Sequence, residues 1–352
     1  MSIRNWFGSV LEWLRDLFRG RPPGAREGHF VVGSKMSWRG WLAHSPWVAP
    51  SRDYLLYVPA NYRAWRGHSL VVWLHGCKQS PEEFAAGTRI AEEADARGMF
   101  VLLPRQSSGA NMEGCWNWFD PATSAGYGEA AIVLAQIAEV RKQYRINASR
   151  VYVGGMSSGG AFAAALAIRH PDRFAGVAIH SGAPCGAGSS AWSAAQALRV
   201  GPNTDVERIA RVERARAPRR ALPLPAMIIH GADDARVHPA NSRRLVTQFL
   251  TLNGDARGAA EGEPVPDDVD RIVDAEGAHT YDVQTFRAGK RTLVQFITVH
   301  GLAHAWSGGD PSYAYHVAHG PDATSLMLDF LLGGKDVSRN LAPSAVPVTK
   351  ES

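Results

Sequence analysis

Short, uniformly apolar runs recur along this chain of 352 residues, separated by longer stretches rich in helix-forming residues. The runs include residues 70–74, 100–103, 177–179 and 227–229. A strand with one solvated face alternates apolar and polar side chains, whereas a parallel strand covered by helices on both faces is apolar throughout. These runs therefore predict parallel strands in the interior of a sheet.

Helical stretches lie between these runs. Residues 81–97, 128–144 and 240–252 favour helices, and residues 53–58 predict an earlier strand that opens the sheet. Alternating strands and helices are typical of a doubly wound α/β fold. With 45% hydrophobic residues, the chain can bury a large core. We expect one α/β domain over residues 29–333, with a mostly parallel sheet and helices on both faces.

The candidate chemistry begins where a predicted strand ends in a glycine-rich turn. Residues 155–159 read Gly-Met-Ser-Ser-Gly, the G-x-S-x-G pattern of a nucleophile elbow, in which a strand turns sharply into a helix. The pattern alone is weak in a chain with 35 glycines, but a strand precedes it and an alanine-rich helix follows. We therefore predict Ser157 as a nucleophile, with the Ser158 N–H facing an oxygen that gains negative charge.

Two later segments supply an acid and a base in the chain order that such an elbow requires. A strand ends in His-Gly-Ala-Asp-Asp, and the spacing favours Asp234 as the acid, with Asp233 holding the turn. His304 follows another strand in a glycine-containing loop and is the predicted base, with His300 as the alternative. The two histidines also suggest a metal pair, but no further ligand set accompanies them, so no metal or other cofactor is expected.

An oxyanion hole needs a second amide beside that of Ser158. The strand at residues 70–74 runs into His-Gly-Cys, and we expect the Cys77 N–H to supply this amide. A His-Gly pair after a strand is common turn chemistry and has little weight by itself. Together with Ser157, Asp234 and His304, it predicts acyl transfer through a covalent intermediate on serine.

Seven segments carry successive motifs in one order: residues 74–79, 106–111, 115–119, 155–160, 230–234, 301–309 and 320–323. They resemble the motifs of the poly(3-hydroxybutyrate) depolymerase family of esterases. The resemblance implies an α/β-hydrolase fold, a triad of Ser157, Asp234 and His304, and action on short-chain hydroxyalkanoate esters as a polyester or its oligomers. Feruloyl and acetylxylan esterases share this catalytic domain and are the alternative. A serine peptidase of the same fold and a non-catalytic, surface-anchored binder are the less favoured alternatives.

The cysteines and tryptophans of these motifs suggest how the site is built. Cys77 and Cys115 lie in loops expected at the same edge of the sheet, which predicts a disulfide, with free buried thiols as the alternative. Trp116, Trp118 and Trp306 are candidates to line an apolar subsite, although tryptophans in loops also pack into cores.

The formal net charge of +5 raises the question of an anionic partner. The arginines are scattered apart from one cluster: Arg199, Arg208, Arg211, Arg214, Arg216, Arg219 and Arg220. It lacks aromatic interleaving and nucleic-acid motifs, so a solvated helix face is favoured and no nucleic-acid partner is expected. The alternative is a cap in which one arginine meets the terminal carboxylate of a hydroxyacid oligomer. The acidic residues 254–278 are expected to form a flexible surface insertion.

Residues 1–28 have an amphipathic pattern of their own. Large apolar side chains recur at helical spacing: Ile3, Trp6, Phe7, Val10, Leu11, Leu14, Leu17 and Phe18. Acidic residues interrupt the run and no cleavage site follows, so it matches neither a cleavable signal peptide nor a membrane span. A helix on a membrane or polyester granule and a helix packed on the domain or a partner both stay open. The family is often exported, which leaves extracellular, surface-associated and cytoplasmic locations open. Residues 334–352 predict a flexible tail.

Overall fold

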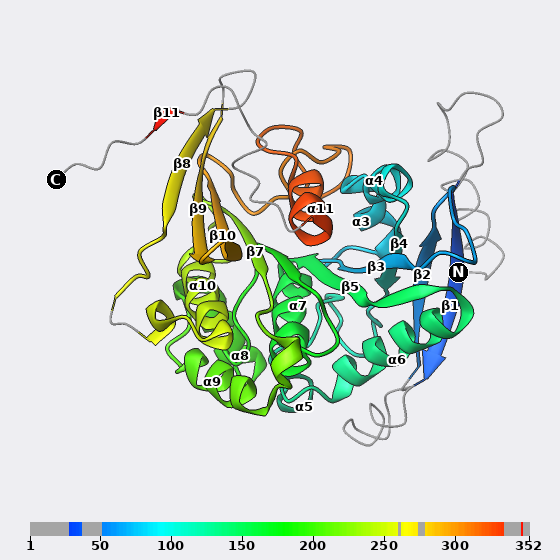
Figure 1. The fold of residues 1–352 in the computed structure, drawn as a ribbon, viewed down its shortest axis with the longest axis horizontal. Coiled ribbons are helices and arrows are strands. Elements are labelled where there is room, and N and C mark those ends of the chain that lie inside the picture. The colour runs from blue at the N-terminus through cyan, green and yellow to red at the C-terminus, as the bar shows by residue number, and fades with distance from the viewer. Residues whose placement is uncertain (1–27, 37–50, 260–261, 274–278, 334–345, 348–352) are drawn as a thin grey trace.

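A single mixed sheet organises the computed structural model, which describes residues 28–36, 51–259, 262–273, 279–333 and 346–347 (Figure 1). The strand order is β1-β2-β4-β3-β5-β6-β7-β10-β9-β8-β11. The predicted amino-terminal helix and almost all of the predicted tail lie outside the described residues. The strands are β1 (His29–Met36), β2 (Ser51–Val58), β3 (His68–Leu74), β4 (Phe100–Pro104), β5 (Ile146–Met156), β6 (Val177–His180), β7 (Ala226–Gly231), β8 (Asp268–Val273), β9 (Thr280–Ala288), β10 (Arg291–Val299) and β11 (Val346–Pro347).

The centre of the sheet is parallel and its two edges are antiparallel. Strands β4, β3, β5, β6, β7 and β10 pair in parallel, whereas β1 and β2 at one edge and β9, β8 and β11 at the other run antiparallel. Every strand expected from an apolar run is present in the parallel centre. The prediction of a mostly parallel interior is therefore confirmed.

Helices cover both faces of this sheet (Figure 1). One face carries α3 (Pro81–Gly87), α4 (Ile90–Arg97) and α11 (Ala323–Gly333). The other carries α6 (Gly128–Gln143), α7 (Ser158–Arg169), α8 (Ala191–Val200), α9 (Val206–Arg216) and α10 (Ala240–Asn253), with the shorter α5 (Pro121–Ser124), η1 (Arg219–Ala221) and η2 (Ala256–Ala259) in the connections. Within the described ranges, no helix combines the length and the apolar character that crossing a bilayer requires.

Strand β3 shows why the apolar runs are uniform. Leu70, Val72 and Leu74 pack into the core beneath α6 and α7, whereas Val71 and Trp73 pack into the core beneath α3, α4 and α11. Successive side chains of a strand point to opposite faces, so a strand covered on both sides needs an apolar residue at every position. The sequence pattern thus encodes the three-layer architecture directly.

The helix expected over residues 81–97 is two helices in the structure. Arg89 adopts a left-handed backbone conformation with φ 53° and separates α3 from α4. A Cβ on Gly87 would lie 2.4 Å from the His316 ring, and the Gly87 carbonyl accepts a hydrogen bond from the Asp310 N–H. The break therefore lets the loop after β10 pack against the end of α3, which helical periodicity does not reveal.

The expectation of a flexible insertion over residues 254–278 is also wrong for much of its length. Residues 268–273 form β8, which pairs with β9. Arg257 forms ion pairs with Asp255 and Asp267, and Arg271 forms one with Asp282. Two of the acidic residues that suggested a solvated loop, Asp255 and Asp267, are thus paired with an arginine of the same segment.

The nucleophile elbow is built by the close approach of α7 to β3. Ser157 joins β5 to α7 with φ 56° and ψ −121°, a strained conformation for a residue with a side chain. Its N–H donates to the His180 carbonyl at 2.9 Å. A Cβ on Gly159 would lie 2.2 Å from the Leu74 carbonyl oxygen and 2.5 Å from that of His75. Only glycine leaves room for the two backbones at this point.

Replacing Gly159 with alanine should therefore destabilise the fold by about 3 kcal/mol, because the obstructing atoms belong to backbone that cannot rotate away. Chemical denaturation followed by circular dichroism measures the effect. Gly109→Ala is the matched control, because the nearest atom to its new Cβ is the Ser107 hydroxyl at 3.5 Å. Equal unfolding midpoints for the two variants would contradict this account of the elbow.

Candidate active site

The three predicted catalytic side chains meet at the carboxyl edge of the parallel strands. Ser157 follows β5, Asp234 follows β7 and His304 follows β10. The His304 Nε2 lies 3.0 Å from the Ser157 Oγ, and its Nδ1 lies 2.7 Å from the Asp234 Oδ2. Both distances are those of hydrogen bonds. The order serine, histidine, aspartate in space is the arrangement that activates a serine oxygen.

The turn after β7 holds the Asp234 carboxylate in place. Its side chain is fully buried, and its Oδ1 accepts hydrogen bonds from the N–H groups of Arg236 and Val237 at 2.9 and 2.8 Å. Burial alone would raise the pKa of Asp234. Hydrogen bonds with His230 and His304, the charge of His304 and the Val237 amide outweigh burial and hold the pKa well below its ordinary value. Asp234 is therefore ionised at neutral pH.

Asp233 and His300, the alternatives for the acid and the base, make other contacts. The Asp233 side chain is exposed, and its backbone N–H donates to the Leu302 carbonyl at 3.1 Å. His300 pairs through its Nε2 with Asp282 at 2.8 Å. A Cβ on Gly231 would lie 2.2 Å from the Leu302 carbonyl oxygen, so the loops that carry the acid and the base pack backbone to backbone.

The loop after β3 is shaped to present its amides to this site. The Gly76 N–H donates to the Gln79 Oε1 at 2.8 Å, and the Gln79 Nε2 donates to the Ala314 carbonyl at 3.1 Å. The Lys78 N–H donates to the Glu113 carbonyl at 2.8 Å. Among the described residues, the Cys77 N–H donates to no backbone carbonyl outside regular elements. Cys77 lines the pocket in which Ser157 lies.

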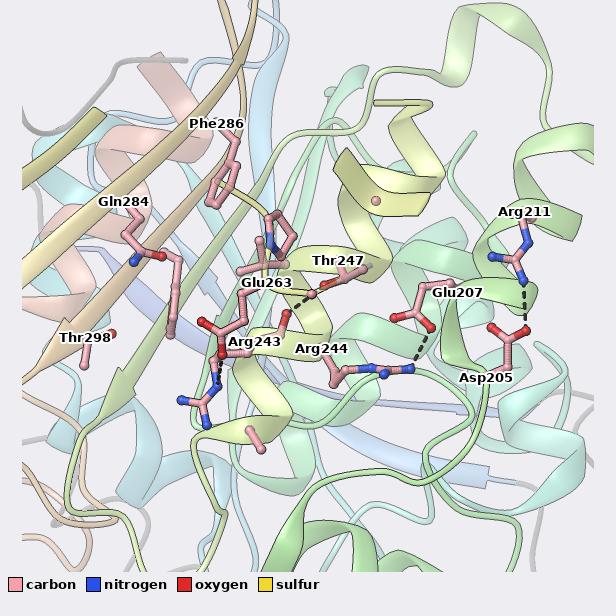
Figure 2. Close-up of a pocket in the computed structure, with 16 residues that line it drawn as sticks. Asp205, Glu207, Arg211, Arg243, Arg244, Thr247, Glu263, Gln284, Phe286 and Thr298 are labelled. Atoms are coloured by element: carbon pink, nitrogen blue, oxygen red, sulfur yellow. Dashed lines mark hydrogen bonds and ion pairs between the residues drawn. The ribbon is translucent and has the colours of Figure 1, made fainter. Parts of the chain in front are cut away.

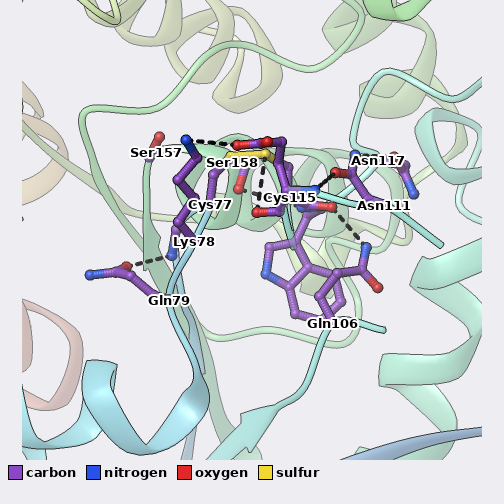
Figure 3. The surroundings of a disulfide bond; sticks show 12 residues. Cys77, Lys78, Gln79, Gln106, Asn111, Cys115, Asn117, Ser157 and Ser158 are labelled. Carbon is purple, nitrogen blue, oxygen red and sulfur yellow. Dashed lines mark hydrogen bonds and ion pairs between the residues drawn. A yellow bond between two sulfur atoms is a disulfide. The ribbon is translucent and has the colours of Figure 1, made fainter. Parts of the chain in front are cut away.

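A disulfide joins this loop to the segment that precedes α5, as predicted (Figure 3). The Cys115 carbonyl accepts a hydrogen bond from the Gln106 Nε2 at 2.9 Å, and the same amide group donates to the Glu129 carboxylate. Glu129 also accepts from the Asn117 N–H at 2.8 Å. Burial raises the pKa of Glu129, although these hydrogen bonds partly oppose the change. No motif distinguishes Glu129 from the rest of its helix, so the sequence gives no signal for this buried support.

The three tryptophans proposed for a substrate subsite are core residues instead. Trp116, Trp118 and Trp306 are all at most 3% exposed, and none of them lines the pocket at Ser157. The Trp116 Nε1 donates to the His75 carbonyl at 3.1 Å, and the Trp306 ring stacks on His180 at 4.9 Å. Their indole groups find partners between the sheet and its helices, so the prediction that they contact substrate is wrong.

His75 and His180 are buried beside these tryptophans and are neutral. Burial lowers the pKa of His75 to about 4, and burial with the nearby charges of His230 and His304 lowers that of His180 to about 3. The His75 Nε2 accepts a hydrogen bond from the Gln106 N–H at 3.2 Å, so its Nδ1 carries the proton. Neither ring lines the pocket at Ser157, and both are uncharged at neutral pH.

The pocket that opens onto Ser157 has a volume of about 250 Å³. Its walls combine apolar side chains with three charged ones: Met156, Leu198, Val237 and Tyr315, then Lys78, Glu113 and Arg236. Sequence analysis identified neither Tyr315 nor Arg236. Arg236 follows the predicted acid closely and offered a signal, whereas nothing in the sequence around Tyr315 distinguishes it.

The arginine cluster of the predicted cap does not reach this pocket. All seven of its side chains are exposed, which agrees with a solvated helix face. From this region only Leu198 lines the pocket. The alternative, in which an arginine of the cluster meets a substrate carboxylate, is therefore wrong for these seven residues.

A larger cavity of about 650 Å³ lies between α9, α10 and strands β9 and β10 (Figure 2). Three ion pairs line it: Arg211 with Asp205, Arg243 with Glu263 and Arg244 with Glu207. It shares no lining residue with the pocket at Ser157 and contains no histidine, serine or cysteine. Its charges are balanced within the protein, and the candidate active site is the smaller pocket.

The fold and the arrangement of Ser157, His304 and Asp234 define an α/β-hydrolase. The chain belongs to the esterase PHB depolymerase family, whose sequence pattern matches residues 52–270. An acetyl xylan esterase from Aspergillus awamori has the same fold, with a TM-score of 0.60 and 19% identity over 78% of this chain and 94% of that one.

The curated relatives are named for different ester substrates. The chain is 32% identical to poly(3-hydroxyalkanoate) depolymerase C of Paucimonas lemoignei, over 70% of this chain and 57% of that protein. It is 30% identical to feruloyl esterase B of Neurospora crassa, over 53% of this chain and 65% of that protein. The chain thus spans less than two thirds of the length of these relatives.

The depressed pKa of Asp234 has a consequence for stability. A carboxyl group whose pKa is lower in the folded than in the unfolded protein binds fewer protons when folded, so the free energy of unfolding falls as pH falls below about 4. Asp234→Asn should lose less stability than the wild type between pH 5 and pH 3. Urea unfolding at each pH measures this. Asp233→Asn is the control and should keep the wild-type pH dependence, whereas identical pH dependence in all three proteins would contradict the assignment.

Loss of the disulfide between Cys77 and Cys115 should lower the rate of ester hydrolysis. Reduction removes the covalent link that holds the loop of the Cys77 N–H, the predicted oxyanion donor. We expect kcat for p-nitrophenyl acetate to fall about tenfold or more, because this N–H loses its fixed position. The double variant Cys77→Ala, Cys115→Ala should show the same loss without reductant and no further change with it. Full activity after complete reduction, checked by mass spectrometry, would contradict this role.

Proposed function

We propose that this protein is a serine carboxylic ester hydrolase that cleaves short-chain hydroxyalkanoate esters, as poly(3-hydroxybutyrate) or its oligomers. The observation that carries the proposal is the continuous hydrogen-bonded series from Ser157 through His304 to Asp234, which ends in a pocket. Membership of the esterase PHB depolymerase family supports the ester-cleaving chemistry. The relative from Paucimonas lemoignei, a poly(3-hydroxyalkanoate) depolymerase by name, supports the hydroxyalkanoate class.

In the proposed reaction, the Ser157 Oγ attacks the ester carbonyl carbon while the His304 Nε2 takes its proton. Asp234 orients the imidazole and stabilises its cationic form, because its own pKa is held low. The N–H groups of Cys77 and Ser158 donate to the oxyanion of the tetrahedral intermediate. Breakdown of this intermediate transfers the proton from His304 to the departing alcohol and leaves an acyl group on Ser157.

Water then enters, loses a proton to His304 and attacks the acyl carbon in the second half of the reaction. The acid is released when Ser157 regains its proton from His304. The name of the Paucimonas lemoignei relative, poly(3-hydroxyalkanoate) depolymerase C, supports hydroxybutyrate in preference to ferulate as the acyl component.

Ser157→Ala should lower kcat/KM for p-nitrophenyl acetate roughly 10⁴-fold or more while the protein keeps its melting temperature within a few degrees. Steady-state hydrolysis and differential scanning fluorimetry measure the two quantities. Ser149→Ala, an exposed serine on β5, is the matched control and should keep full activity. Undiminished turnover by Ser157→Ala would refute the assigned nucleophile.

A substrate panel on one preparation tests the acyl preference. We expect the wild type to cleave 3-hydroxybutyrate oligomers and polymer film in preference to methyl ferulate and acetylated xylan. Preference for either plant-derived ester would place the protein with the feruloyl or acetylxylan esterases instead. Cleavage of peptide amides above all esters would support a peptidase, and failure of Ser157 to react with an organophosphonate would support a non-catalytic binder.

A further inference from the structure

Two cations line the pocket at Ser157, and they differ in their partners. The Lys78 ammonium group forms an ion pair with Glu113 at 2.9 Å, and the hydrogen bond between them raises the pKa of Lys78. Arg236 has an exposed side chain and no ion pair with any described residue. The pocket therefore has one positive charge that no carboxylate of the described protein neutralises.

The position of Arg236 is fixed by the catalytic machinery itself. Its backbone N–H donates to the Asp234 Oδ1 at 2.9 Å. Its guanidinium group lies over the Tyr315 ring, 5.4 Å from the centroid. The Tyr315 ring in turn lies edge to face with the His304 ring, with 6.3 Å between the two ring centroids. A guanidinium that packs on a ring by its face keeps N–H donors at its edge for a carboxylate. Arg236 thus presents a held charge on the side of the pocket where His304 lies.

The hydroxyalkanoate oligomers proposed above as substrates carry a negative group that matches the charge of Arg236, and this inference rests on that proposed function. An oligomer of a hydroxyacid carries one carboxylate, on its terminal unit. The last ester bond joins the oxygen of this unit to the rest of the chain. We propose that Arg236 binds this terminal carboxylate and so places the last ester bond at Ser157. The protein would then prefer anionic oligomers and release the hydroxyacid unit at their carboxyl end.

The chemical step follows from this placement. The Ser157 oxygen forms a bond to the acyl carbon, and the bond from that carbon to the 3-oxygen of the terminal unit breaks. His304 returns the proton taken from Ser157 to this oxygen, so the terminal unit departs as a hydroxyacid anion with its carboxylate still at Arg236. Water then releases the shortened chain from Ser157 with a new carboxylate, the group required for the next round.

The test compares the 3-hydroxybutyrate dimer as its sodium salt with the methyl ester of the same dimer. The wild type should cleave the anionic dimer with the higher kcat/KM. Arg236→Gln should lower kcat/KM for the anionic dimer about tenfold or more, the effect of losing one charge-assisted hydrogen bond, and should change that of the methyl ester less than twofold. The loss should appear mainly in KM, and Arg236→Lys should restore part of it.

Two controls separate the inference from its foundation. Arg219→Gln removes an exposed arginine that does not line the pocket and should leave both substrates unchanged. An unchanged ratio of the two substrates in Arg236→Gln, or an equal loss on both, would overturn the role of Arg236 alone. Failure of the wild type to cleave either dimer while it still hydrolyses p-nitrophenyl acetate would overturn the proposed substrate class and this inference with it.

Discussion

The contact between the start of α7 and the end of β3 is the constraint on which the whole site depends. Gly159 lies against the carbonyl groups of Leu74 and His75 so closely that no side chain fits between them. This contact fixes where Ser157 stands and brings the loop of Cys77 to the same pocket. The strain of the Ser157 backbone is tolerated because the sheet and α7 hold both its sides. A looser packing would separate Ser157, the proposed nucleophile, from the Cys77 loop.

The turn after β7 combines electrostatics with recognition. Asp234 is buried and ionised because two histidines and two backbone amides surround its carboxylate. One of these amides belongs to Arg236, so the residue proposed to bind substrate is anchored by the residue that orients His304. A shift of the backbone in this turn would therefore alter the imidazole and the pocket together, whereas a change of the Arg236 side chain alone leaves its amide bond to Asp234 in place.

The buried polar groups behind the Cys77 loop provide a second layer of support. Glu129 accepts hydrogen bonds from the Gln106 side-chain amide and the Asn117 backbone N–H, and the Gln106 amide also donates to the Cys115 carbonyl. Each of these groups would be costly to bury without its partner. Their mutual hydrogen bonds hold the segment around Cys115, and through the disulfide the Cys77 loop, in one defined position. Trp116 adds to this support, because its Nε1 donates to the His75 carbonyl and its ring stacks on Phe162.

Local patterns were sufficient to predict the parallel centre of the sheet and to single out Ser157, Asp234 and His304, which the structure brings together, because uniform apolar runs and glycine turns reflect their own surroundings. They could not separate Asp234 from Asp233 beyond a preference in spacing, since adjacent residues differ only in which one the packed loops turn inward. They misplaced Trp116, Trp118 and Trp306, whose burial depends on helices distant in the sequence. They also passed over Arg236 and Tyr315, which form one wall only after loops from β7 and β10 pack together. The sequence by itself determined which groups can react, and the tertiary structure decided which of them meet, because those distances depend on backbone contacts between segments far apart in the chain.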